Sequence, residues 1–377
     1  MKIDMVNKIN KTSTYNKTLI DLIVSGLKKK SDEVETYALN LSRLVKYTEP
    51  DLSKKIIHAL SSHSLNPSFL RGVSNPIPTD VDSRLEMATI ITPNIEKNVF
   101  PILNPIIKET IESFLYERER ISELLEKDIK PSTGLLLTGH PGTGKTMLAR
   151  HIASALNKNL IILDLSTSIS SLLGKTGQNL KRVLEYARQS SAVLLLDEFD
   201  AIAKRRDDST DLGEIKRVVN VLLMELESWP VSSVVIATSN HPELLDRAIW
   251  RRFDHVIELG LPEQKERIEI LTRELGGFLN KKDSTFIPLI AELLAQKSPA
   301  DLCRLSENIK RRVVLKNEDV SKAILHVVES HTNDKETKGK FCVLAKQMLG
   351  NKITVRELAE ITGFSPGGVQ YHIGKQE

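Results

Sequence analysis

A chain of 377 residues has the length for two or three domains and for a sizeable hydrophobic core. Its 53 Lys and Arg residues nearly balance 49 Asp and Glu residues, so the net charge of +4 does not indicate a class of partner. No apolar run approaches the roughly 20 residues of a membrane-spanning helix, and the charged N-terminus is unlike a secretory signal. Both observations argue against a membrane protein, and we expect a cytoplasmic one.

The N-terminal part of the chain shows the periodicity of helices rather than strands. Four apolar residues fall on one face of a predicted helix: Val34, Ala38, Leu41 and Val45. We therefore expect a helical N-terminal bundle over residues 1–72, followed by a linker and leading helices over residues 73–130. Ser, Asn, Pro and Gly residues concentrated between Ser61 and Asp80 mark this boundary, and the pattern from Val81 to Pro131 is helical again.

A glycine-rich loop follows the apolar run from Gly134 to Leu137 and precedes an amphipathic segment from Met147 to Leu156. Its spacing is G-x-x-x-x-G-K-[ST], in which glycines let backbone N–H groups turn toward an anion at a helix N-terminus. The eight residues are Gly139, His140, Pro141, Gly142, Thr143, Gly144, Lys145 and Thr146. The spacing predicts a phosphate-binding loop, with Lys145 reaching the β- and γ-phosphates and the Thr146 hydroxyl binding magnesium.

Apolar strand candidates alternate with helix-length segments after this loop. They are Leu160–Leu165, Ala192–Leu196, Ser233–Thr238 and Val256–Leu259. This βαβ rhythm predicts an α/β fold over residues 131–260, with a parallel sheet and helices on both faces. From Glu263 to about His331 only helical patterning remains, which predicts a helical lid over residues 261–332.

Acidic and polar residues end two of these strands. Asp197 and Glu198 emerge at the carboxyl end of a buried strand, where open α/β sheets bind ligands. We expect Asp197 to hold magnesium through water and Glu198 to polarise the water that attacks the γ-phosphate of ATP. Asn240 ends the next strand and can place its amide beside the same water. The alternative for Asn240 is a turn-forming residue before His241 and Pro242.

The stretch from Gly134 to about Lys310 resembles the AAA family of ATPases. GHPGTGKT is similar to that family's Walker A loop, with His140 in the place of the usual proline. LLLDEFDAIAKRR, from Leu194 to Arg206, is similar to its Walker B strand. ATSNHPELLDRAIWRRFD, from Ala237 to Asp254, resembles the second region of homology that separates these ATPases from other P-loop proteins.

The resemblance implies roles that spacing alone does not give. Asn240 takes the position of the family's sensor residue, and Arg251 and Arg252 take that of arginine fingers that reach the neighbouring subunit's site. A guanidinium at the γ-phosphate neutralises charge in the transition state. The implied assembly is a homo-oligomer, a hexameric ring, with ATP and Mg²⁺ as cofactors. The alternative for the two arginines is a surface basic pair.

Two segments depart from the family pattern. Ser170 to Ala187 is similar to the segment with the first pore loop, where an aromatic residue normally stands before an aliphatic residue and glycine. Here the triplet is Leu172, Leu173 and Gly174, which can grip an extended polypeptide through apolar contact or form a packed loop. The second segment, Ser298 to Asp301, resembles the family's Ser-Gly-Ala-Asp near the adenosine, with proline in place of glycine.

The C-terminal residues 338–377 resemble a helix-turn-helix. Thr354 would cap a helix that runs to Ile361, Gly363 would make the turn, and Ser365 would cap a second helix. Three residues of the second helix are candidates to face a DNA major groove: Gln370, Tyr371 and His372. The alternative is a helical hairpin that packs on the ring or on a partner.

These features support one main hypothesis, a bacterial-type, ring-forming AAA ATPase that remodels or unfolds a protein substrate or partner. The alternative is a nucleic-acid-linked ATPase of transposition, replication or transcription control that uses the C-terminal helix-turn-helix. A third hypothesis, a switch in which nucleotide only gates assembly, has little need for Glu198. The N-terminal bundle joined to this ATPase also resembles bacterial ATPases encoded beside a subtilisin-like protease, in which case cleavage would belong to that separate partner.

Overall fold

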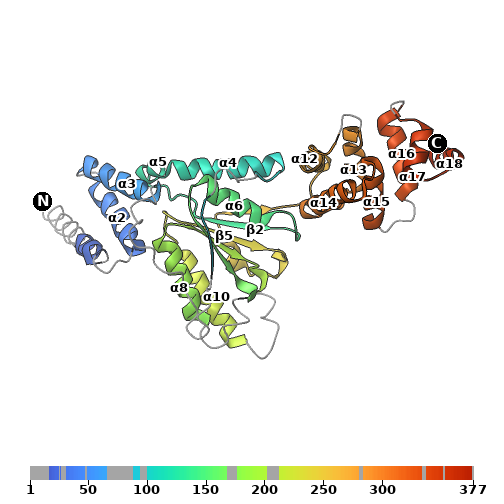
Figure 1. The fold of residues 1–377 in the computed structure, drawn as a ribbon. Helices are drawn as coiled ribbons and strands as arrows, with labels where there is room; N and C mark the ends of the chain where they lie inside the picture. The colour runs from blue at the N-terminus through green and yellow to red at the C-terminus, as the bar shows by residue number, and fades with distance from the viewer. Residues whose placement is uncertain are drawn as a thin grey trace. The chain divides into compact units, whose positions relative to one another are not determined.

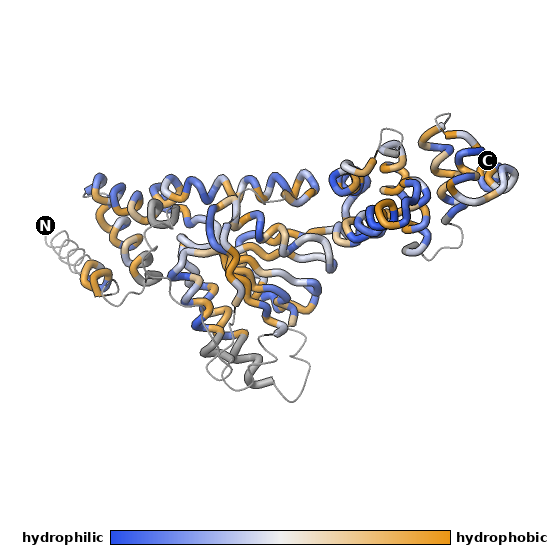
Figure 2. The backbone as a smooth tube through the Cα atoms, in the orientation of Figure 1, coloured by the Kyte–Doolittle hydropathy of each residue, from blue (hydrophilic) through white to orange (hydrophobic). Residues whose placement is uncertain are grey.

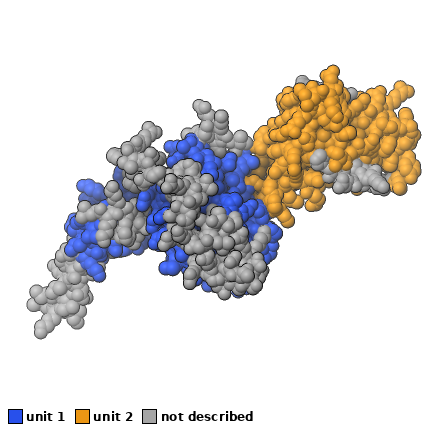
Figure 3. Space-filling view, turned by 60° about the horizontal axis from the view of Figure 1, so that its bottom comes forward, with its two compact units in different colours: residues 1–101, 106–139, 145–258 blue, residues 102–105, 140–144, 259–377 orange. Residues whose placement is uncertain are grey.

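The computed structural model describes eleven stretches of the chain (Figure 1): residues 17–24, 26, 31–46, 49–65, 88–93, 100–167, 176–201, 212–279, 283–332, 337–350 and 353–375. The chain forms two compact units (Figure 3). The first unit comprises residues 1–101, 106–139 and 145–258, and the second comprises residues 102–105, 140–144 and 259–377. Each unit is described by itself.

Two N-terminal helices, α2 (Ser31–Val45) and α3 (Pro50–Leu65), belong to the first unit. The sequence predicts the buried face of α2 correctly, because Ala38, Leu41 and Val45 are buried and Val34 is half-buried. The next helices that the structure describes are α4 (Pro105–Glu119) and the short α5 (Ile121–Glu126). A small apolar cluster joins α3 to α5 through Ile57, Ile121 and Leu125, with Leu39 of α2 packed against it.

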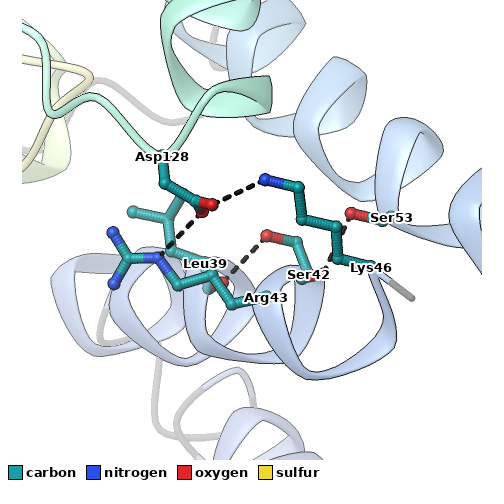
Figure 4. Close-up of polar contacts among 6 residues, drawn as sticks. All are labelled: Leu39, Ser42, Arg43, Lys46, Ser53 and Asp128. Carbon is teal, nitrogen blue, oxygen red and sulfur yellow. Dashed lines mark hydrogen bonds and ion pairs between the residues drawn. The ribbon is translucent and has the colours of Figure 1, made fainter. Parts of the chain in front are cut away.

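Polar contacts beside this cluster fix the end of α2 (Figure 4). Lys46 Nζ lies 2.6 Å from Asp128 Oδ2, and Arg43 Nε lies 3.5 Å from Asp128 Oδ1. The Ser53 hydroxyl donates to the carbonyl oxygen of Ser42 at 2.9 Å, which links α3 to α2. The hydrogen bond from Lys46 lowers the pKa of Asp128. Because both ion pairs are exposed, burial of Ile57 and its apolar neighbours contributes more to this contact.

A six-stranded sheet forms the centre of the first unit, in the order β1-β3-β4-β5-β2-β6. The strands are β1 (Thr89–Ile91), β2 (Gly134–Thr138), β3 (Leu160–Asp164), β4 (Val193–Asp197), β5 (Val234–Ser239) and β6 (His255–Glu258). All pairings are parallel except that of β1, which runs antiparallel to β3 at the edge. The four strand candidates that follow the phosphate-binding loop in the sequence are confirmed as β3 to β6, and the apolar run from Gly134 to Leu137 forms β2. The helical prediction for residues 81–131 is wrong at β1, because three residues are too few to show a strand's alternation.

Helices cover both faces of this sheet, with α6 (Lys145–Ala155) on one face and α8 (Thr176–Gln189) and α10 (Leu212–Glu227) on the other (Figure 1). Successive residues of each strand point alternately to the two faces of the sheet. Leu194 and Leu196 of β4 belong to a core cluster with Leu184 of α8 and Leu222 of α10. Figure 2 shows the strands as the apolar centre of the unit, as expected for a parallel sheet buried on both sides.

The second unit is helical. Its first part contains α12 (Gln264–Leu275), a 3-10 turn (Asp283–Phe286), α13 (Ile287–Leu293), α14 (Pro299–Lys316) and α15 (Val320–Thr332), in agreement with the helical patterning of the sequence. Arg267 is buried and crosslinks two segments, because its Nε donates to the carbonyl oxygen of Ala291 and its Nη1 to that of Pro262, each at 2.6 Å. The first bond attaches α12 to α13, and the second attaches α12 to the segment that precedes it.

Three helices complete the second unit: α16 (Thr337–Leu349), α17 (Val355–Thr362) and α18 (Pro366–Gly374). Thr354 and Ser365 cap α17 and α18 as the sequence predicts, and Gly363 ends α17 with a φ of 73°. These helices share one hydrophobic cluster with α12 to α15, in which Phe341 of α16 stacks on Phe286 with ring centroids 6.2 Å apart. Among the helices described in either unit, none is both long and apolar enough to cross a membrane.

Candidate active site

The loop between β2 and α6 has the backbone of a phosphate cradle. Gly139, Gly142 and Gly144 have φ angles of 136°, 80° and 100°, a region that residues with a side chain rarely adopt. The Thr143 hydroxyl donates to the carbonyl oxygen of His140 at 2.8 Å and closes the turn. The sequence therefore needs glycine at these three positions for a conformational reason, whatever the loop binds.

The middle of this loop also contacts the start of α14. The backbone N–H of Ala300 donates to the carbonyl oxygen of Gly142 at 3.1 Å. A Cβ atom at Gly142 would lie 2.8 Å from the Ser298 hydroxyl oxygen, which leaves no room for a side chain. Ser298 caps α14 and forms a capping box with Asp301, while Pro299 occupies the first turn. The segment that departs from the family pattern thus retains a well-formed helix start against the phosphate loop.

Lys145, the first residue of α6, turns back toward the start of the loop. Its Nζ donates to the carbonyl oxygen of Gly139 at 2.7 Å, and its side chain is buried. Burial lowers the pKa of Lys145, whereas the negative charges of Asp197 and Asp200 raise it. The structure therefore brings the lysine of the loop close to the carboxylates at the end of β4 and just beyond it.

Thr146 and Asp197 meet at the carboxyl edge of the sheet. The Thr146 hydroxyl donates to Asp197 Oδ2 at 3.3 Å, although 51 residues separate them along the chain. A hydroxyl and a carboxylate are hard oxygen ligands, and Mg²⁺ commonly takes one or two such protein ligands together with water and substrate phosphates. The donors present here therefore fit Mg²⁺.

Glu198 and Asn240 are held at the same edge through their backbones. Glu198 has a φ of 53°, and its side chain is exposed. The backbone N–H of Asn240 donates to Asp200 Oδ1 at 3.0 Å, and the Ser239 hydroxyl donates to the same oxygen at 3.3 Å. Asp200 is only 3% exposed. Sequence reasoning did not single out Asp200, and its one available signal was a carboxylate at the fourth position of the Asp-Glu-Phe-Asp run.

The two candidate arginine fingers have different surroundings. Arg252 Nη1 lies 3.1 Å from Glu227 Oε1 at the end of α10. Arg251 is exposed, and among the residues that the structure describes it has no ion pair. Asp254 fixes the segment that follows, because its Oδ2 accepts the backbone N–H groups of Thr133 and Gly134 at 2.7 and 2.9 Å. Arg252 is thus paired within its own chain, whereas Arg251 is exposed.

The remaining candidate residues belong to two other segments of the chain. The candidate pore-loop residues Leu172, Leu173 and Gly174 lie outside the described part of the chain. On α18, Gln370 and Tyr371 are exposed. His372 is half-buried, and its ring stacks on that of Phe364 with centroids 5.0 Å apart. Its ring is therefore packed against the turn between α17 and α18.

A serine motif in the C-terminal part has a structural explanation. Gly363 to Gly367 reads G-F-S-P-G, which fits the G-x-S-x-G spacing of a nucleophile elbow in hydrolases. Such an elbow requires a strand before the serine, whereas α17 precedes Ser365. The Ser365 hydroxyl oxygen accepts the backbone N–H of Gly368 at 3.1 Å and caps α18. Capping therefore accounts for this serine.

Comparison with known proteins gives the family. Residues 135–261 match the ATPase family associated with various cellular activities (AAA). An uncharacterized AAA family ATPase of Sinorhizobium fredii is 41% identical over 147 residues, which are 39% of this chain and 44% of that relative. The proteasome-activating nucleotidase of Thermococcus onnurineus is 33% identical over 269 residues, which are 67% of each chain. The chain belongs to the AAA family of ATPases.

Solved structures of AAA domains agree with this assignment at the level of the fold. The FIGL-1 AAA domain in complex with ADP superposes with a TM-score of 0.53 and 20% identity, covering 70% of this chain and 94% of that one. The AAA match includes β2, the phosphate loop and the strands up to β6, and it stops before α12. The chain spans less than half the length of the rhizobial AAA relative.

Proposed function

We propose that this chain hydrolyses ATP with Mg²⁺ in a homo-oligomeric ring, most simply a hexamer, and uses hydrolysis to remodel or unfold a protein. The observation that carries the proposal lies at the carboxyl edge of the sheet, where Thr146 contacts Asp197 and the charges of Asp197 and Asp200 act on Lys145. Glu198 directly follows Asp197 in the chain, and Asp200 binds the backbone N–H of Asn240. Similarity to a proteasome-activating nucleotidase supports a protein as the partner that is remodelled.

The chemistry follows from these side chains. The loop from Gly139 to Gly144 and the Lys145 ammonium bind the phosphates, and Thr146 with Asp197 holds Mg²⁺. The ion neutralises phosphate charge when it is bound. Glu198 is exposed and accepts a proton from the attacking water. The Asn240 side chain orients that water or the γ-phosphate.

A neighbouring subunit completes the site in this proposal. Arg251 is exposed and belongs to the segment that resembles the arginine-finger region of AAA ATPases, so it is suited to act in trans. Leu172 and Leu173 remain candidates for contact with a polypeptide in the ring pore. A separately encoded protease is a further candidate partner.

Substrate capture from the cells that produce this protein tests the remodelling role. The Glu198→Gln chain is used as bait in ATP, and the Lys145→Ala chain, which lacks the phosphate-binding ammonium, is the matched control. We expect the first bait to retain a set of proteins, measured by mass spectrometry, that the second does not retain. Identical sets from the two baits would contradict ATP-dependent capture.

DNA binding by α17 and α18 is the second candidate function. Gln370 and Tyr371 are exposed on α18, and the Lys375 ammonium lies 5.9 Å from the centroid of the Tyr371 ring. This is the face that a recognition helix would present to base edges and phosphates. Residues 338–377 carry six Lys or Arg against three Glu, which favours phosphate contact only modestly.

Point substitutions test DNA binding better than truncation, because α16 shares its core with α12 to α15 through Phe341. We expect the double variant Gln370→Glu, Lys375→Glu to bind duplex DNA about tenfold more weakly and with a smaller dependence on salt. Fluorescence anisotropy from 50 to 300 mM salt measures both, and Lys338→Glu, at an ion pair with Glu329, is a control that also reverses one lysine charge. Equal affinity of the parent and the double variant would rule out this surface.

A further inference from the structure

Thr238 contacts three consecutive residues of the candidate catalytic segment. It is the penultimate residue of β5 and is 1% exposed. Its hydroxyl donates to Asp197 Oδ1 and accepts the backbone N–H of Glu198 at 3.2 Å. Its carbonyl oxygen accepts the backbone N–H of Phe199 at 2.8 Å. One buried residue on a neighbouring strand therefore holds the whole turn from Asp197 to Phe199.

The turn at Glu198 needs such support. Its φ of 53° lies in the left-handed region, which is unfavourable for a residue other than glycine. The parallel ladder between β4 and β5 ends at the pair Leu196 and Ala237, so the backbone beyond it depends on other hydrogen bonds. The Thr238 hydroxyl and carbonyl oxygens supply two of them. The direction of the Glu198 side chain is thereby tied to β5.

The same hydroxyl also sets the orientation of Asp197. Oδ1 of Asp197 accepts the hydrogen bond from Thr238, and Oδ2 accepts that from Thr146 on α6. The two bonds fix the carboxylate plane between a strand and a helix. A hydroxyl has one proton to donate and lone pairs to accept, so Thr238 can make both of its side-chain bonds at once.

We propose that Thr238 is a positioning residue that couples the Mg²⁺-binding carboxylate of Asp197 to the catalytic carboxylate of Glu198. The proposal rests on the proposed ATP hydrolysis and assigns to this hydroxyl the alignment of both groups. Outer-shell hydrogen bonds to metal ligands are commonly worth 10–100-fold in metal affinity or activity. Thr238 itself transfers no proton to substrate.

Two substitutions distinguish the effect of the Thr238 hydroxyl from the effect of the packing of its side chain. Thr238→Val preserves the shape and removes both hydrogen bonds of the hydroxyl, whereas Thr238→Ser keeps them and removes a methyl group. Thr362→Val is the matched control, because Thr362 is also buried and its hydroxyl bonds Leu358 and Phe364 in the second unit. All three are made in the full chain, and thermal unfolding is measured for each.

The first readout is the binding of a fluorescent N-methylanthraniloyl derivative of ATP. The Mg²⁺ concentration is varied while all other components are held constant. We expect Thr238→Val to raise the Mg²⁺ concentration at half-maximal effect about tenfold, with nucleotide binding in EDTA unchanged. The second readout is steady-state hydrolysis, in which kcat should fall about 10–100-fold with little change in the KM for ATP. Thr238→Ser should restore both quantities to within about threefold of the parent, a residual loss expected from the missing methyl.

Each outcome decides the proposal. Unchanged Mg²⁺ dependence and kcat in Thr238→Val would overturn it, as would a Thr238→Ser variant that behaves like Thr238→Val. If Thr362→Val changes the Mg²⁺ dependence and kcat as much as Thr238→Val does, the effect is common to the removal of any buried hydroxyl. That result would also overturn the proposal. If the parent chain does not hydrolyse ATP, the proposed function fails. In that case the Mg²⁺ titration of nucleotide binding still tests Thr238.

Discussion

The Glu198→Gln variant is expected to hydrolyse ATP at least about 100-fold more slowly than the parent, while its affinity for ATP stays within about twofold. The amide has nearly the same shape as the carboxylate but accepts no proton from water at neutral pH. Because the Glu198 side chain is exposed and its turn is held through the backbone N–H, folding should not change. Phosphate release and binding of an ATP analogue measure the two quantities.

A neighbouring glutamate provides the control for this substitution. Glu243 is exposed and lies 3.0 Å from the imidazole of His241, just beyond the end of β5. Its carboxylate has no role in the proposed chemistry, so Glu243→Gln should retain the parental rate. Hydrolysis by Glu198→Gln at the parental rate would remove Glu198 from the catalytic role. If Glu198→Gln and Glu243→Gln lower the rate of ATP hydrolysis equally, the loss comes from the negative charge at this edge of the sheet and not from proton transfer to Glu198.

Arg251→Ala is expected to lower kcat by about 10³-fold without loss of ATP binding, if the guanidinium acts on the γ-phosphate of a neighbouring subunit. Arg251 is exposed in its own chain, so its loss leaves no buried charge unpaired. Mixing Arg251→Ala with Lys145→Ala should recover activity, because some interfaces then combine an intact phosphate loop with an intact arginine. Hydrolysis measured across mixing ratios gives the result.

Two neighbouring arginines sharpen this experiment. Arg247 is exposed at the start of α11 (Arg247–Trp250), and Arg247→Ala should keep the parental rate. Arg252 pairs with Glu227. If Arg252→Ala and Glu227→Gln lower the rate of hydrolysis equally, the loss comes from this ion pair and not from the site of a neighbouring subunit. No recovery of activity at any mixing ratio would contradict a site shared between subunits.

Local sequence patterns predicted most of the fold because they repeat over many residues. The strands β2 to β5 are buried apolar runs, β6 is a partly exposed edge strand, and the sequence locates each of the five to within one residue at either end. Caps at Thr354 and Ser365 are also local, because the capping side chain and the N–H group it binds are three residues apart. The short edge strand β1 was missed, since three residues that pair with β3 carry no periodic signal of their own.

The sequence predicted only part of the candidate site. The phosphate loop and the acidic end of β4 are contiguous motifs, and the structure brings Thr146 and Asp197 into contact as a site of this kind requires. The roles of Thr238, Asp200 and Asp254 were not visible, because each binds groups that are about 40 residues or more away along the chain. The pairing of Arg252 with Glu227 likewise depends on where α10 ends beside the sheet.

The sequence by itself determined the phosphate loop, the alternation of strands and helices, and the family resemblance that the comparisons confirmed. These are properties of contiguous residues, so glycine conformations and apolar periods suffice to specify them. Only the tertiary structure decided which polar groups meet at the edge of the sheet. The strand order puts β5 beside β4, and that adjacency places the Thr238 hydroxyl between Asp197 and Glu198. Hydrogen bonds between strands far apart in sequence exist only once that order is set.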